Sequence, residues 1–100
     1  MKRWAMVAAL VLAAGTAGAT DMCSAEGTLA EGIMAMRQAG FSIAEVRAKV
    51  DHLPIKDLYE QMILEAFDSH RYLTEQMQDR TQEEFRNRWQ VKCIKEGREN

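Results

Sequence analysis

The sequence is poor in residues that break helices or build strands. Proline occurs once among 100 residues, at Pro54, and no segment alternates apolar and β-branched residues long enough to form a strand. Ala, Glu, Gln, Met, Arg and Leu dominate instead, and they favour helices. No internal repeat, low-complexity tract or interdomain linker interrupts the chain. The composition therefore predicts an all-α fold, with one helical domain over residues 20–100.

Residues that carry catalysis or bind metals are few. The chain has three serines, Ser24, Ser42 and Ser69. None of them lies in a Gly-x-Ser-x-Gly turn that would expose a nucleophile. His52 and His70 have no second ligand close in sequence, whereas zinc and copper sites usually need three or four. Met34 and Met36 have a copper-like spacing, but on a helix they point about 200° apart. We expect no enzyme, cofactor or metal site, and keep a periplasmic metal binder as an alternative.

Basic clusters are absent from the sequence. The 13 basic residues are scattered among 15 acidic ones, which gives a formal net charge of −2. Nucleic-acid binding depends on clustered Lys and Arg, so no nucleic-acid partner is expected. Protonation of the many carboxylates at low pH would leave a positive, self-repelling chain. This property keeps an acid- or envelope-stress chaperone as an alternative function.

The one long apolar run lies at the N-terminus. Lys2 and Arg3 precede an apolar stretch over residues 4–14, and Ala17 and Ala19 are small residues at the positions a signal peptidase inspects. This pattern predicts a signal peptide over residues 1–19. The mature protein is then periplasmic or secreted, in a bacterium, with no stable membrane span after cleavage.

A retained membrane anchor is the alternative to cleavage. The uncharged stretch over residues 4–20 is only 17 residues long, the short limit for a spanning helix, and its last six residues are small or polar. Both features favour cleavage. Cys23 follows Thr20, Asp21 and Met22 and lacks the Leu of a lipoprotein signal, so we do not expect it to be acylated.

The chain has only two cysteines, Cys23 and Cys93. In an oxidising compartment an even number favours pairing, and two cysteines allow one intramolecular disulfide. A redox or metal role is disfavoured because there is no Cys-x-x-Cys motif and no flanking His to lower the pKa of a thiol. Closing a loop of this length stabilises a fold by about 4 kcal/mol in the chain-entropy model. The disulfide is expected to join the start of the first helix to the end of the last.

Four helices are expected. The first runs over about residues 24–39 and is followed by Gly40. Ser42 and Glu45 form a capping box that starts the second helix at Ile43. That helix ends before Leu53, because the following proline disfavours helical geometry there.

The third helix is expected to contain Pro54 in its first turn, where a missing N–H is tolerated. Thr74 is expected to cap a long fourth helix and Gly97 to end it. Four apolar residues of that helix fall in one inward row with a spacing of four or its multiples, at Met77, Phe85, Trp89 and Cys93, while Val91 and Ile94 lie to the sides of this row.

The connection before the fourth helix holds the candidate binding residues. His70, Arg71 and Tyr72 combine an imidazole, a cation and an aromatic ring, which suits recognition. Alternatively, Tyr72 and Leu73 fold back onto the end of the bundle and leave Arg71 in water. Arg37 is a further candidate, or it stabilises the negative end of the first helix.

A set of residues along the chain carries a resemblance. It consists of Cys23, the segment MAMRQAGFS over residues 34–42, Ala66 and Phe67, RYLTE over residues 71–75, Phe85 and Cys93. This pattern resembles a group of short exported bacterial helical proteins to which no activity is attached. In its gross anatomy the chain also resembles periplasmic acid-stress chaperones, but it lacks their aromatic-Thr-Cys opening and separates its cysteines more widely.

These observations predict a small, exported, non-enzymatic envelope protein. Its expected partner is another envelope or secreted protein, in an inhibitor, immunity or accessory role. The sequence leaves the oligomeric state open.

Overall fold

A computed structural model describes residues 21–97 of the chain. The predicted signal peptide over residues 1–19 lies outside the described residues. Four helices make up the described part: α2 (Met22–Gln38), α3 (Ile43–Val50), α4 (Lys56–Asp68) and α5 (Glu75–Lys95). The absence of strands from this part confirms the all-α prediction. Within the same range, no helix is both long enough and apolar enough to cross a membrane.

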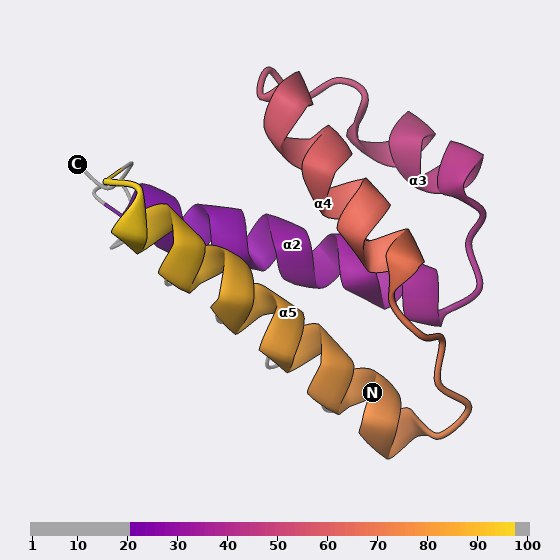
Figure 1. The fold of residues 1–100 in the computed structure, drawn as a ribbon. Coiled ribbons are helices and arrows are strands. Elements are labelled where there is room, and N and C mark those ends of the chain that lie inside the picture. Colours follow the sequence, from indigo (N-terminus) through magenta and orange to yellow (C-terminus); the bar gives the residue numbers. More distant parts are fainter. Residues whose placement is uncertain (1–20, 98–100) are drawn as a thin grey trace.

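The helices are arranged around one long antiparallel pair. Helices α2 and α5 lie side by side and make the most extensive contact between any two helices (Figure 1). Helix α4 crosses α2, and α3 packs mainly against α4. Short connections join consecutive helices, as expected for a small helical bundle.

All four helices contribute side chains to the core. Its buried members are Ala30, Ile33, Met34, Val46, Val50, Tyr59, Met62, Ile63, Ala66, Phe85 and Trp89. The predicted inward row of α5 is confirmed at Phe85, Trp89 and Cys93, which are buried, whereas Met77 at its start is only partly buried. Gly27 allows the two long helices to approach closely, since a Cβ atom there would lie 3.2 Å from the carbonyl oxygen of Arg86.

Several predicted helix boundaries are confirmed. The amide of Glu45 donates to Ser42 Oγ at 3.1 Å, and the amide of Ser42 donates to Glu45 Oε1 at 2.8 Å, which completes the capping box. Thr74 Oγ1 accepts from the amide of Met77 and caps α5. Gly97 follows the end of α5 with a φ of +71°. The start of α3 and both ends of α5 are therefore set by residues close to them in sequence.

Two boundaries differ from the expectation. Helix α2 begins two residues early because Asp21 Oδ1 accepts from the amide of Ser24 and caps the helix. Pro54 was wrongly placed in the first turn of the third helix. The turn that ends α3 extends to Leu53, whose amide donates to the carbonyl oxygen of Val50. Pro54 and the non-helical Ile55 then connect this turn to α4, which starts at Lys56.

The predicted disulfide is present. Cys23 and Cys93 are bonded, with their Cα atoms 5.3 Å apart, and neither side chain is exposed. The bond joins the first turn of α2 to the last turn of α5. The four-helix array is therefore closed covalently at one end of its longest helix pair.

Candidate functional site

The other end of this helix pair is closed by the α4–α5 loop, residues 69–74. The loop leaves α4 beside the C-terminal end of α2 and leads into the start of α5 (Figure 1). It contains His70, Arg71 and Tyr72, three of the four predicted binding residues. The fourth, Arg37, lies in the last turn of α2.

Gln38 holds the loop from inside the protein. Its side chain is 1% exposed. The side-chain Nε2 atom donates to the carbonyl oxygen of His70 at 2.8 Å, and Oε1 accepts from the amide of Tyr72 at 2.7 Å. The backbone carbonyl of Gln38 also accepts from Arg71 Nε at 3.2 Å. Three successive loop residues are therefore bonded to one residue of α2, which fixes the course of the backbone.

Two further side chains complete this attachment. Arg37 Nη2 donates to the carbonyl oxygen of Ser69 at 3.2 Å, and its guanidinium lies over the ring of Phe67, 5.1 Å from the centroid. Gln78 Nε2 donates to the carbonyl oxygen of Tyr72 at 2.8 Å. The loop backbone is thus hydrogen-bonded to both long helices, although its residues form no regular structure.

Gly40 leaves room for Arg71. Its φ is +97°, a conformation that strains any residue with a side chain. A Cβ atom at this position would lie 2.7 Å from Arg71 Nη2. The glycine that ends α2 therefore also admits the side chain that bonds to the carbonyl oxygen of Gln38.

The four predicted binding residues lie close together in the structure, but they make different kinds of contact. Arg37 and Arg71 hold backbone carbonyl groups, so Arg71 is not simply solvated. His70 is exposed, and its ring packs edge-on against the partly buried ring of Tyr72, with 4.9 Å between centroids. Leu73 is 93% exposed, so the interpretation that it plugs the bundle is wrong. The amide and carbonyl groups of Tyr72 are bonded to α2 and α5, and the next side chain is left in solvent.

The sequence analysis missed Gln38, although the residue lies on a visible pattern. Ala30, Met34 and Gln38 are spaced by four along α2, and all three are buried. A polar residue that continues a buried row must find hydrogen-bond partners. Its position predicts a buried amide, but the sequence does not show which distant backbone groups satisfy it.

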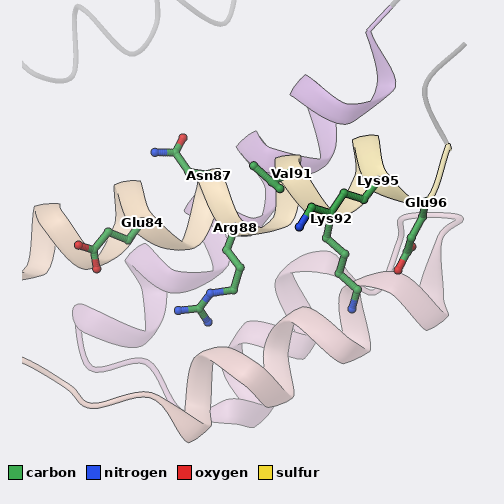
Figure 2. A pocket seen from close by; sticks show the side chains of 7 residues that line it. All are labelled: Glu84, Asn87, Arg88, Val91, Lys92, Lys95 and Glu96. Carbon is green, nitrogen blue, oxygen red and sulfur yellow. The ribbon is translucent and has the colours of Figure 1, made fainter.

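A cleft of about 710 Å³ follows the outer surface of α5. It is lined by Glu84, Asn87, Arg88, Val91, Lys92, Lys95 and Glu96 (Figure 2). Arg88 pairs with Glu65 of α4 at 3.5 Å, and Lys92 Nζ lies 4.5 Å from the centroid of the Trp89 ring. Val91 is its one apolar lining residue, and charges of both signs surround it. Apart from Val91, the cleft therefore lacks the hydrophobic and aromatic side chains that typically line a small-molecule site.

The two histidines lie in different connections, His52 after α3 and His70 after α4. Between residues 21 and 97, no three His, Cys, Asp or Glu side chains are grouped so that they could hold a metal ion.

Comparison with known proteins gives no relative. No protein-family model, curated protein or solved structure matches this chain. The function must therefore be argued from the geometry of its own residues.

Proposed function

We propose that this protein is a small protein-binding scaffold of the bacterial envelope, and that the α4–α5 loop is its recognition surface. The observation that supports this most strongly is the exposure of Leu73. This leucine is 93% exposed, on a loop whose backbone is hydrogen-bonded to both α2 and α5. A single exposed leucine is common on protein surfaces. Here the exposed leucine directly follows Tyr72, whose backbone amide and carbonyl groups are both hydrogen-bonded.

The energetic argument concerns the cost of ordering the loop. Burying the amide of Gln38 is unfavourable unless all its polar atoms are bonded, and two of its partners are loop backbone groups. A surface that is ordered before binding loses less conformational entropy when a partner arrives. The hydrogen bonds to Gln38 therefore favour binding through the loop, although Gln38 itself does not contact the partner.

The exposed groups indicate the chemistry of the partner. Leu73 offers an apolar anchor, and His70 offers an exposed ring with a hydrogen-bonding nitrogen. Arg37 and Arg71 are already engaged by the loop itself. The complementary surface is a protein with an apolar pocket for a leucine side chain and a polar rim beside it.

The disulfide and the predicted signal peptide support the proposed compartment. A buried disulfide is typical of exported proteins. The partner is therefore proposed to be another envelope or secreted protein, with this chain acting as an inhibitor, an immunity factor or an accessory subunit.

Position-specific crosslinking tests this proposal. A photoreactive amino acid is placed at Leu73 and, as a matched control, at Leu64, which is 61% exposed on α4. In intact cells we expect one discrete crosslinked protein from position 73 and none from position 64. The crosslinked protein is then purified, and its affinity for Leu73→Asp and Leu64→Asp variants is measured. We expect at least about a tenfold loss for the first variant only, equivalent to about 1.4 kcal/mol.

Two outcomes would contradict the proposal. One is the absence of a position-specific crosslink at Leu73. The other is equal affinity of the purified protein for both aspartate variants, with both variants shown to be folded by circular dichroism.

A further inference from the structure

A buried carboxyl group lies against the disulfide. Glu26 is 6% exposed, and its Oε2 atom is 3.4 Å from Cys93 Sγ. Glu26 follows Cys23 by three residues on α2, so the two side chains lie on the same face of that helix. Among residues 21–97, Glu26 is the one buried acidic residue. A carboxyl oxygen therefore contacts one of the two atoms that react when the disulfide forms.

The two sulfur atoms stand at opposite ends of their helices. Cys23 lies in the first turn of α2, where the positive end of the helix dipole stabilises a thiolate. Cys93 lies in the last turn of α5, where the negative end disfavours one. In the reduced protein, Cys23 is therefore the better nucleophile toward an oxidant. The Cys93 thiol must lose its proton to attack, because the thiolate is the nucleophile.

We propose that Glu26 is the proton acceptor that closes the protein's own disulfide. The Cys23 thiolate first attacks a disulfide oxidant, a small-molecule disulfide or the disulfide of a thiol oxidase. A mixed disulfide forms at Cys23, and one thiolate of the oxidant leaves. The Cys93 thiol then attacks Cys23 Sγ and transfers its proton to Glu26 Oε2. The bond between Cys23 and the oxidant breaks, and the second thiolate leaves. The two cysteines are oxidised by two electrons, and the oxidant is reduced by two.

Glu26 is the acidic side chain in contact with Cys93. Its Oε2 atom lies 3.4 Å from Cys93 Sγ, so a short movement of the thiol keeps the carboxylate within reach of the proton. The basic residues in the last turn of α5 are Lys92 and Lys95, which as cations cannot accept it. Lys92 also lies over the ring of Trp89.

Acid-quenched oxidation of the reduced protein tests the proposal. The chain is reduced, desalted and mixed with oxidised glutathione, and mass spectrometry separates the dithiol, the mixed disulfide and the closed form. For Glu26→Gln we expect mixed-disulfide formation at the wild-type rate and closure slower by about a hundredfold, the lower range of general-base effects. Glu26→Asp is expected to recover part of the closure rate, because it keeps a carboxylate.

Glu31→Gln is the matched control. It removes the same charge from α2, at a half-exposed residue that pairs with Arg86 at 3.8 Å and is not in contact with the sulfur atoms. Equal slowing of closure in Glu26→Gln and Glu31→Gln would overturn the proposal, as would wild-type closure in Glu26→Gln. Peptide mapping of the wild-type intermediate gives an independent result that needs no variant. We expect glutathione on Cys23, and its location mainly on Cys93 would also overturn the proposal.

Discussion

The two ends of the α2–α5 pair are closed by different kinds of interaction. At one end a buried disulfide joins Cys23 to Cys93. At the other, Gln38 and Arg37 hold the α4–α5 loop through hydrogen bonds to backbone groups. A covalent bond constrains the unfolded chain as well as the folded one. Hydrogen bonds act only in the folded protein, and each contributes far less to its stability.

The two ends of the helix pair therefore have different roles: one stabilises the fold, and the other presents exposed side chains to solvent. The disulfide end has fully buried cysteines and provides constraint, whereas the loop end presents an exposed leucine and histidine beside a buried glutamine. If the comparison is correct, changes at the first end alter global stability most. Changes at the second end alter the order of the loop more than the fold.

Removal of the disulfide is expected to have the largest effect. The double variant Cys23→Ala, Cys93→Ala releases a constraint over a sequence separation of 70 residues. Its free energy of unfolding is expected to fall by about 4 kcal/mol, because the unfolded chain regains the entropy that the crosslink removed. Urea unfolding followed by circular dichroism measures this loss. A decrease below about 1 kcal/mol would show that the disulfide is not the main constraint.

Removal of the Gln38 side chain is expected to have the next largest effect. Gln38→Ala leaves the amide of Tyr72 and the carbonyl of His70 without their partner, which costs about 2 kcal/mol in the free energy of unfolding. Urea unfolding provides the measurement. Gln78→Ala is the control, since it releases only the carbonyl of Tyr72, and a smaller loss is expected. An equal loss in both variants would remove the special role given to Gln38.

The sequence predicts the first end of the pair better than the second. Two cysteines allow a single pairing, and the spacing of Phe85, Trp89 and Cys93 indicates which face of α5 is buried. The capping box of α3 is equally local. Each of these inferences needs only residues close in sequence or a choice with one solution.

The loop end depends on contacts between distant residues. Gln38 bonds to residues 32 and 34 positions later in the chain, and no local rule identifies such partners. Glu26 was missed for the same reason, since its neighbour Cys93 lies 67 residues away. Both polar residues continue the row of Ala30 and Met34 with a spacing of four, so their burial could be inferred but their function could not.

Substitution of Gly40, which follows α2, tests the packing at the loop end. Gly40→Ala forces a side chain into a positive φ and against Arg71, so the free energy of unfolding is expected to fall by about 1 to 3 kcal/mol. Gly32→Ala is the matched control within α2, where a Cβ atom meets nothing within 4 Å. This control is expected to stabilise the protein by up to about 1 kcal/mol. Thermal unfolding of both variants checks the two signs, and the same sign in both would contradict the prediction.

The smallest expected effect lies at the start of α3. The backbone amide and hydroxyl of Ser42 hold the pKa of Glu45 below its ordinary value of 4.5, with a further contribution from Lys49. A lowered pKa in the folded protein means that this stabilisation is present above pH 4.5 and is lost as the pH falls through the folded pKa.

Comparison of acid unfolding curves measures this contribution. Glu45→Gln is expected to lose slightly less stability than wild type as the pH is lowered below 4.5, because it has no proton to bind there. Glu83→Gln, on the exposed side of α5, is the matched control for the loss of one charge. A steeper pH dependence in Glu45→Gln than in wild type would contradict the assigned direction.

Hydrogen exchange of the Tyr72 amide tests most directly whether Gln38 holds the α4–α5 loop in an ordered state. In the native wild-type protein this amide is expected to exchange slowly, although it lies in an irregular loop, because it donates to the buried Oε1 of Gln38. In Gln38→Ala it is expected to exchange freely while the core amides of α2 and α5 remain protected. Rapid exchange of the Tyr72 amide in the wild-type protein would show that the loop is not held, and would contradict its proposed role as an ordered recognition surface.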